Sequence, residues 1–440
     1  MKWFAEHALL PSGPAEAVLF EETDGRFTAM TAGARPDGAT VIAGLTVPGF
    51  ANCHSHAFHR ALRGRTSAGA GTFWTWREQM YAIAARLDPD SYLALARSTY
   101  AEMALAGITS VGEFHYLHHA PGGVPYAHPN AMAHALEQAA ADAGIRLTLL
   151  DTAYLAGGLD AGGHLPLDEV QQRFADRDVD AWSARVDALQ PTTPRMRVGV
   201  AAHSVRAVPR EALTVVAAVA AGRPLHVHLS EQPAENDACQ AFYGRTPTAL
   251  LDEAGILGPD TTAVHATHLT GHDIAALGRT RTTACFCPTT ERDLADGIGP
   301  ARALLDAGAL LSLGSDQHAV IDLLEEARAL EMDERLASGQ RGWFTPTDLL
   351  DALTRHESIG WDAGQLAVGA RADLVGVRLD SVRTAGAAPD QALLAATAAD
   401  VHTVVVDGRI VVEGGRHILG DVGSLLQQAI EPLWREAQRR

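Results

Sequence analysis

Lysine is almost missing from this sequence of 440 residues, in which Lys2 is the only one. Arginine therefore carries nearly all of the positive side-chain charge, and the 35 basic residues are outnumbered by 53 acidic ones, giving a formal net charge of −18. Nucleic acids and anionic membranes bind proteins through basic patches, so this balance argues against both as partners. A small anionic substrate held by a few local arginines remains compatible with it.

Long apolar runs and paired cysteines are missing as well. The longest apolar stretch, Leu213–Ala221, is too short to cross a bilayer. Residues 1–7 do not have the charged and apolar segments of a secretion signal. The four cysteines include no Cys-x-x-Cys pair, which fits a reducing compartment. We therefore expect a cytoplasmic protein without a membrane partner.

What the sequence does contain is a regular alternation of short β-rich runs and helical patterns. Asp88-Pro89 predicts the start of one helix, and Asn130 and Gly144 predict the two ends of another. Eight such strands predict an α/β fold, a (β/α)₈ TIM barrel over residues 47–365. The predicted strands are 45–54, 108–114, 146–153, 196–202, 224–229, 262–268, 282–287 and 310–315.

The two ends of the chain have a different composition. Residues 1–46 and 366–420 are rich in Val, Ile and Gly and contain Asp-Gly turns such as Asp24-Gly25 and Asp407-Gly408, which are typical of β-hairpins. We expect these two segments to meet in one small β-sandwich beside the barrel. Residues 421–440 are predicted to form an amphipathic, solvent-facing C-terminal helix.

Histidines and one aspartate follow several of the predicted barrel strands. His54 and His56 end the first strand, and alternate residues of a strand point the same way, so both imidazoles can reach one ion. His228, His265 and Asp316 end later strands. Active sites of such barrels lie at the C-terminal ends of the strands. Neutral imidazoles with one carboxylate suit Zn²⁺, or Fe²⁺ as a competitor, with one position left for water.

This pattern resembles the amidohydrolase superfamily, which has His-x-His after strand one, His after strands five and six, and Asp after strand eight. The resemblance implies that His54, His56, His228 and Asp316 hold the metal. It also implies that His265 acts as a base, that Asp316 orients the water and accepts its proton, and that Glu231 protonates the departing nitrogen. Because no lysine follows the fourth strand, the lysine-bridged pair of metals found in binuclear members is excluded, and a single ion is expected.

Within that superfamily the sequence resembles the formimidoylglutamate deiminase family. The segments that carry the resemblance are 53–61, 72–81 with its Phe-Trp-Thr-Trp-Arg motif, 113–116 and 203–209. The resemblance implies a homodimer that hydrolyses N-formimino-L-glutamate to N-formyl-L-glutamate and ammonia in histidine degradation. Arg77 and Arg206 are expected to bind the two substrate carboxylates, since guanidinium binds carboxylate in bidentate fashion. Tyr116 is expected to donate a further hydrogen bond, and His59 stands where the family usually has Gln.

Two other functions remain open from the sequence. One is a related aminohydrolase that acts on a purine, a pterin or S-adenosylhomocysteine, which would need fewer carboxylate-binding groups and more aromatic surface. The other is a barrel that has lost catalysis and serves in binding or assembly. The pairing of Arg77 with Arg206 favours the dicarboxylate substrate, and the complete set of ligand and acid/base residues speaks against a loss of catalysis.

Overall fold

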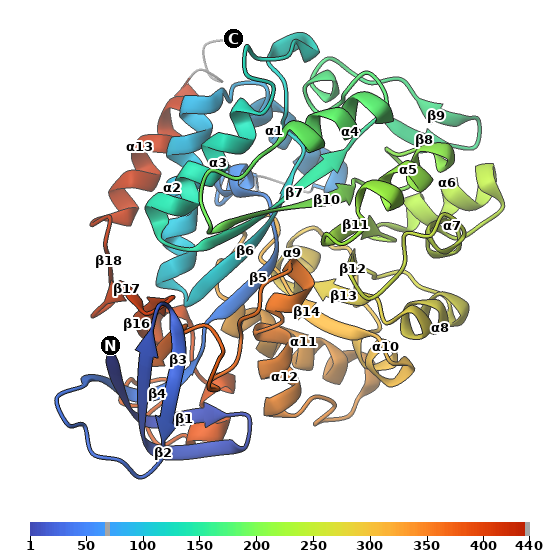
Figure 1. Ribbon diagram of the computed structural model, residues 1–440. Coiled ribbons are helices and arrows are strands. Elements are labelled where there is room, and N and C mark those ends of the chain that lie inside the picture. Colours follow the sequence, from blue (N-terminus) through green and yellow to red (C-terminus); the bar gives the residue numbers. More distant parts are fainter. Residues whose placement is uncertain (67–70, 436–440) are drawn as a thin grey trace.

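A computed structural model describes residues 1–66 and 71–435 of the protein, and Figure 1 shows a barrel of strands wrapped by helices with a separate sheet at one end. The last residues of the predicted C-terminal helix, 436–440, lie outside the described part.

Eight parallel strands form the barrel, in the order in which they occur in the chain. Residues of these strands are mostly buried on both faces, as expected for a parallel sheet covered by helices. The amide nitrogens of Ser315 and Asp316 donate to the carbonyl oxygen of His54, which brings the last strand beside the first and nearly closes the ring. The predicted barrel is thus confirmed. Its strands are β5 (Phe50–Ser55), β6 (Ile108–His115), β7 (Arg146–Ala153), β10 (Met196–Ala202), β11 (Leu225–Leu229), β12 (Thr261–His265), β13 (Thr283–Phe286) and β14 (Leu310–Leu313).

Helices follow the strands and pack outside them. Asp88 caps the first of the two predicted helices through its side chain, and Gly144 ends the second in the left-handed conformation, as the sequence predicts. The described helices are α1 (Phe73–Ala84), α2 (Pro89–Leu105), α3 (Ala131–Ala143), α4 (Val179–Ala188), α5 (Arg210–Val219), α6 (Pro233–Tyr243), α7 (Pro247–Glu253), α8 (Gly271–Thr280), α9 (Pro288–Asp293), α10 (Ala301–Ala307), α11 (Leu323–Ser338), α12 (Pro346–Leu353) and α13 (Val422–Arg435). None of the helices in 1–66 and 71–435 combines the length and the apolar character that a membrane span needs.

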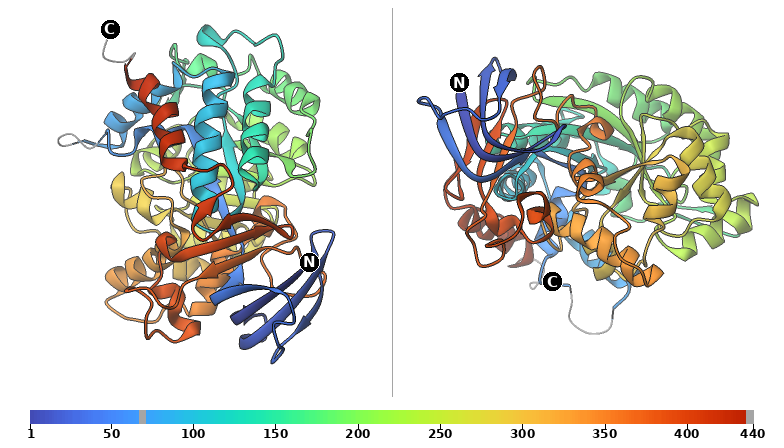
Figure 2. Two further views of the ribbon diagram at one scale, coloured as in Figure 1. Left: turned by 90° about the vertical axis from the view of Figure 1, so that its left-hand side faces the viewer. Right: turned by 90° about the horizontal axis from the view of Figure 1, so that it is seen from below.

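The two ends of the chain meet in one mixed sheet of eight strands, in the order β18-β17-β16-β15-β4-β1-β2-β3. Its centre is the antiparallel pair of β15 with β4, which joins the C-terminal segment to the N-terminal one. Figure 2 shows this sheet at the end of the barrel away from the C-terminus. Its strands are β1 (Lys2–Leu10), β2 (Gly13–Thr23), β3 (Arg26–Thr31), β4 (Thr40–Pro48), β15 (Leu374–Val377), β16 (Val401–Val406), β17 (Arg409–Glu413) and β18 (Arg416–His417), while β8 (Gly158–Asp160) and β9 (Gly163–Leu165) form a separate hairpin.

The predicted strand 45–54 is two strands in the structure. β4 belongs to the terminal sheet and β5 to the barrel, with Gly49 between them. A Cβ atom at Gly49 would lie 2.2 Å from the Oγ1 atom of Thr109, so only glycine allows the chain to pass this close to the second barrel strand. The contact partner is 60 residues away in sequence, which is why the apolar run alone predicted one continuous strand.

The C-terminal helix α13 lies along α2, as the left view of Figure 2 shows. Its buried side chains recur at helical spacing, and its other face is exposed, which is the expected amphipathic pattern. The indole nitrogen of Trp434 donates to the carbonyl oxygen of Ala61, 2.8 Å away, so the helix is tied to the segment that follows β5.

Candidate metal centre and active site

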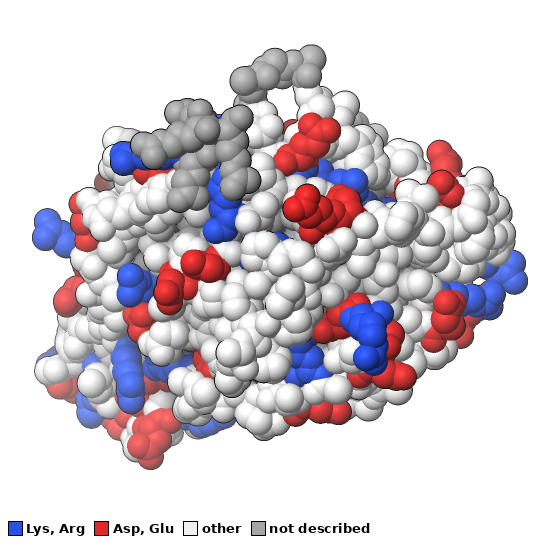
Figure 3. All heavy atoms as spheres, turned by 90° about the horizontal axis from the view of Figure 1, so that it is seen from above, with Lys and Arg blue, Asp and Glu red and all other residues white. Residues whose placement is uncertain are grey.

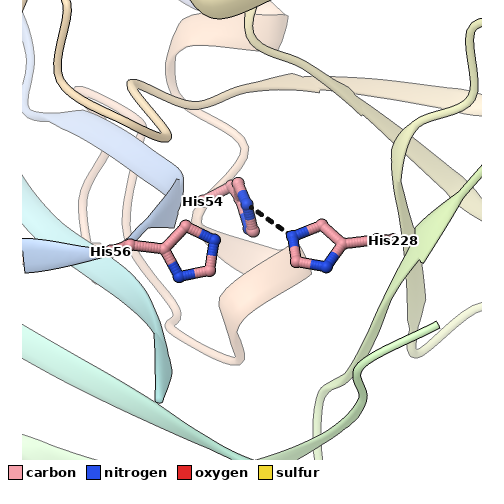
Figure 4. Close-up of side chains that lie close together, drawn as sticks. All are labelled: His54, His56 and His228. Atoms are coloured by element: carbon pink, nitrogen blue, oxygen red, sulfur yellow. Dashed lines mark hydrogen bonds between the residues drawn. The ribbon is translucent and has the colours of Figure 1, made fainter. Parts of the chain in front are cut away.

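Three histidine rings converge at the C-terminal end of the barrel, as Figure 4 shows. His54 and His56 come from β5 and the residue after it, and His228 comes from β11. The Nε2 atoms of His54 and His228 are 3.2 Å apart. Asp316 Oδ1 lies 3.3 Å from His54 Nε2 and 3.4 Å from His56 Nε2. The structure therefore gathers His54, His56 and His228 closely enough to share one ion, and places Asp316 beside the first two.

The outer nitrogens of two of these rings are held by the backbone. His56 Nδ1 lies 3.0 Å from the carbonyl oxygen of Phe114, and His228 Nδ1 lies 3.0 Å from that of His203. A carbonyl oxygen accepts only from a protonated nitrogen, so in both neutral rings the lone pair sits on Nε2 and points to the common centre. Burial, reinforced by the neighbouring His54, lowers the pKa of His56 to about 3, and burial holds the pKa of His228 well below its usual range. Neutral, buried imidazoles beside one carboxylate are the donor set of a divalent cation.

Strained backbone carries three of the site residues. Ser230, His265 and Asp316 have φ angles of 51°, 68° and 39°. Residues other than glycine rarely adopt this left-handed region, and such strain persists where the surroundings fix it. Here the amide of Asp316 donates to the carbonyl oxygen of His54 at 3.0 Å. This hydrogen bond holds the strained turn that follows β14 against the first barrel strand.

The predicted acid/base residues lie beside the metal ligands. His265 Nε2 is 3.7 Å from Glu231 Oε1 and 4.0 Å from Asp316 Oδ2, and His265 Nδ1 is 3.3 Å from Glu291 Oε1. Burial alone would lower the pKa of His265, but the carboxylates of Glu231, Glu291 and Asp316 raise it to about 10. A bound cation would oppose this effect, because its own charge disfavours imidazolium. His265, Glu231 and Asp316 therefore form one cluster of buried ionisable groups beside the metal-ligand candidates.

A cavity opens above this group and contains the predicted substrate-binding residues. His59 Nε2 lies 3.0 Å from the hydroxyl of Tyr116. The Arg77 guanidinium stacks over the rings of Trp74 and Tyr81, at 4.8 and 5.3 Å from their centroids. The cavity is lined by His56, His59, Phe73, Trp76, Arg77, Met80, Tyr81, Tyr116, Tyr154, Phe174, His203, Arg206, His228, Glu231, His265, Leu294 and Asp316.

Arg206 lies in the cavity wall but is already paired. Its Nη2 atom is 3.2 Å from Glu231 Oε2, and its Nε atom is 3.0 Å from Glu235 Oε2. Burial works to lower the pKa of Arg206, yet the two glutamates raise it. Within residues 1–66 and 71–435, Arg77 pairs with no carboxylate, so it is the freer of the two guanidinium groups for a ligand.

Sequence reasoning missed three side chains of this site. Glu291, at the start of α9 after β13, contacts His265. Glu235, in the first turn of α6, contacts Arg206. His203 follows β10 and lines the cavity. The position of His203 at a strand end was a usable signal, whereas nothing in the sequence indicates which way the two glutamates point.

The surface around the barrel mouth mixes the two charge signs. Figure 3 shows arginine and acidic side chains as separate small groups over this face. In the parts shown in colour no single sign dominates.

Comparison with known proteins agrees with this geometry. The model of the amidohydrolase family matches residues 45–411. Formimidoylglutamate deiminase of Pseudomonas aeruginosa is 38% identical over 94% of this chain and 95% of its own length, which confirms the predicted similarity. The 8-oxoguanine deaminase of the same organism is 31% identical over 83% of this chain and 81% of its own.

A crystal structure of an amidohydrolase from Brucella melitensis superposes with a TM-score of 0.91 at 33% identity, covering 98% of this chain and 99% of its own. Sequence, fold and the arrangement of ligands thus agree that the protein belongs to the amidohydrolase family and is a hydrolase of carbon–nitrogen bonds.

Proposed function

We propose that this protein is a formimidoylglutamate deiminase, which hydrolyses N-formimino-L-glutamate to N-formyl-L-glutamate and ammonia. The observation that carries the proposal is the 38% identity with the Pseudomonas aeruginosa enzyme of that name over nearly the whole of both chains. The relationship to the 8-oxoguanine deaminase is weaker in identity and in coverage.

One divalent cation, zinc in the first instance and iron as the alternative, fits between His54, His56, His228 and Asp316. The facing Nε2 atoms of His54 and His228, 3.2 Å apart, are two lone pairs that a shared cation would satisfy. When bound there, the cation supplies a water molecule whose pKa falls from about 15.7 toward about 7. The only lysine is Lys2, so a lysine-bridged second ion is not part of the proposal.

The proton transfers are assigned to three side chains. Asp316 Oδ2 and His265 Nε2, 4.0 Å apart, face the same space and take up the proton of the attacking water. Glu231 Oε1, 3.7 Å from His265 Nε2, relays to the departing nitrogen the two protons that the water gives up, one when it attacks and one when the C–N bond breaks, so the nitrogen leaves as ammonia. All three groups are buried, so bulk water does not compete for these protons.

The substrate carboxylates are assigned to the arginine side of the cavity. Arg77 is the principal carboxylate-binding residue, because its guanidinium is stacked on aromatic rings and lacks a carboxylate partner within the described residues. Arg206 contributes a smaller share, since Nε and Nη2 already contact glutamates. The hydrogen-bonded pair of His59 and Tyr116 lies on the metal side, where the formimino group would bind.

The proposal also includes a place of action. We propose that the protein acts in histidine degradation and is located in the cytoplasm. We also propose that it is a homodimer and that its binding partner is the small dicarboxylate substrate. The support for these points is the similarity to the Pseudomonas aeruginosa enzyme and a composition without basic patches or paired cysteines.

Ammonia release from a panel of compounds tests the proposed activity. Formimino-glutamate should be hydrolysed much faster than guanine, 8-oxoguanine or S-adenosylhomocysteine, and chelation should abolish the reaction until metal is restored. Reaction with a purine while formimino-glutamate stays inert would favour the ring-directed alternative. A protein that holds no metal after purification or after zinc addition would instead favour the non-catalytic barrel.

A further inference from the structure

Buried and partly buried groups of alternating charge form a row along one wall of the cavity. The row begins at Glu235 in α6, continues through Arg206 and Glu231, and ends at His265. Successive contacts are 3.0 Å from Glu235 Oε2 to Arg206 Nε, 3.2 Å from Arg206 Nη2 to Glu231 Oε2, and 3.7 Å from Glu231 Oε1 to His265 Nε2. Low solvent exposure keeps such charges poorly screened, so each one constrains the next.

Glu235 uses both of its carboxylate oxygens, each for a different neighbour. Oε1 accepts the backbone N–H of Ser230 at 3.2 Å, and Oε2 forms the ion pair with Arg206. Ser230 lies between the metal-ligand candidate His228 and Glu231, and its φ is 51°. The side chain of Glu235, which is only 1% exposed, therefore contacts both the strained turn before Glu231 and Arg206, the arginine that is paired with the carboxylate of Glu231.

We infer that Glu235 is a positioning residue, which fixes the carboxylate of Glu231 for proton transfer. Glu235 does not line the cavity at the metal ligands but the adjoining one, which shares Arg77, Tyr154, His203 and Arg206 with it. Its contacts with Ser230 and Arg206 are the route by which we assign its effect on Glu231. The inference rests on the proposed function, because it takes Glu231 as the group that protonates the departing nitrogen.

The chemistry of the two contacts shows why glutamine cannot replace Glu235. Ser230 presents an N–H donor and Arg206 a positive charge, and the carboxylate of Glu235 forms a hydrogen bond with the first and an ion pair with the second. A glutamine of the same shape has one acceptor oxygen and one NH₂ donor, so either Ser230 or Arg206 would face a donor. Glu235→Gln thus breaks one of the two contacts at nearly constant volume.

Glu331 in α11 offers a matched control outside the site. It is also 1% exposed, and its Oε1 atom accepts from Arg335 Nε at 2.6 Å and from the N–H of Gly342 at 2.9 Å. Its Oε2 atom accepts from the N–H of Phe344 at 2.9 Å. Glu331→Gln therefore disturbs a buried glutamate with arginine and backbone partners, but no residue of the cavity.

Steady-state kinetics of the metal-loaded variants give the first test. Glu235→Gln should lower kcat for formimino-glutamate roughly 10- to 100-fold, the usual effect of losing a residue that orients a catalytic group. KM should change by less than about threefold, as long as Arg77 keeps the substrate. Glu235→Asp, which retains two acceptor oxygens on a shorter arm, should lose less. Glu331→Gln should lower the melting temperature about as much as Glu235→Gln does. It should leave kcat and KM at their wild-type values.

Several outcomes would overturn the inference. One is a kcat of Glu235→Gln within about twofold of wild type; another is an increase in KM alone, which would mean that Glu235 serves the substrate site. If Glu331→Gln loses as much kcat as Glu235→Gln, the loss in Glu235→Gln is explained by general destabilisation of the protein. If Glu235→Gln does not fold, an unaltered kcat in Glu235→Asp would also overturn the inference.

Crystal structures of the same variants test positioning without any substrate. In Glu235→Gln the carboxylate of Glu231 should move away from His265, and in Glu331→Gln it should stay in place. If the wild-type protein does not hydrolyse formimino-glutamate, the proposed function is wrong. The position of the Glu231 carboxylate in the Glu235→Gln structure still tests whether Glu235 positions it. An unmoved Glu231 in Glu235→Gln would refute it.

Discussion

Two groups of buried histidines lie at the C-terminal end of the barrel strands, and their surroundings differ. The pocket cluster consists of His54, His56, His228 and His265. The loop cluster consists of His115, the last residue of β6, and of His118 and His119, which follow it. In the pocket cluster, ring nitrogens face one another and a shared carboxylate. Within 1–66 and 71–435, the sets of donor atoms close enough to share a metal include no residue of the loop cluster.

The loop cluster has its own fixed partners. His118 Nε2 lies 3.0 Å from the carbonyl oxygen of Thr152, and His119 Nε2 lies 3.1 Å from Asp176. Arg185 pairs with Asp176 at 2.8 Å, so that carboxylate is shared with a permanent cation. Both clusters are rich in histidine, and the difference between them is the direction of the ring nitrogens. A metal site is therefore recognised by lone pairs that converge, not by the number of histidines.

The largest effect expected from breaking the pocket cluster comes from Asp316→Asn. The substitution removes the negative charge from the common centre and the acceptor that faces His265. We expect kcat to fall by at least about 10³-fold, the scale seen when a catalytic carboxylate is made neutral. Steady-state ammonia release measures it, with a melting curve to show that the fold is retained. Activity within tenfold of wild type would remove Asp316 from the mechanism.

The same substitution in both clusters compares them directly. His228→Gln should lower activity at least about 100-fold and release the metal, because one ligand is lost. His118→Gln should keep kcat within about threefold, since its ring contacts the backbone of Thr152, Asp151 and the other two rings of the loop cluster, and does not line the cavity. Equal losses of activity in the two variants would contradict the distinction between the clusters.

Substitutions of Arg77 and Arg206 should affect different kinetic constants. Arg77→Ala is expected to raise KM roughly 10- to 100-fold with little change in kcat, because a charge-assisted contact common to ground state and transition state is lost. Arg206→Ala should lower kcat as well, since Arg206 also contacts Glu231. An unchanged KM in Arg77→Ala would exclude it from substrate binding, and Arg77→Lys serves as the charge-retaining control.

Acid and base should destabilise the metal-free protein for different reasons. The lowered pKa of His56, about 3, means that the unfolded chain takes up the proton first, so stability is lost as pH falls from 6.5 toward 3. The raised pKa of His265, about 10, contributes stability that is complete below pH 6.5 and is lost as pH rises through 10. Urea titrations should show the free energy of unfolding falling by about 2 kcal/mol or more from pH 6.5 to 5. A flat profile over this range would contradict the assigned protonation states.

Much of the fold and the metal site follows from local pattern. The period of two in a strand places His54 and His56 together, and the rule that sites form at strand ends selects His228, His265 and Asp316. These inferences need only the order of the elements. The eight barrel strands and the terminal β segments were predictable because each follows from the local sequence pattern.

The remaining parts depend on contacts between distant segments. The division of 45–54 into β4 and β5 is imposed by Thr109, which packs against Gly49. Glu235 and Glu291 lie in the first turns of α6 and α9, and their partners Arg206 and His265 belong to other segments of the chain. The pairing of Arg206 with two glutamates likewise required the folded arrangement, since an acidic chain offers many partners for each arginine.

Metal analysis combined with an anomalous-scattering crystal structure tests the central claim most directly. We expect one zinc or iron ion per chain, about 2.0–2.2 Å from the Nε2 atoms of His54, His56 and His228 and from Asp316. The His118→Gln variant should retain that ion, and His228→Gln should not. A protein that carries no ion after incubation with either metal, or one whose ion lies in the loop cluster, would contradict the account.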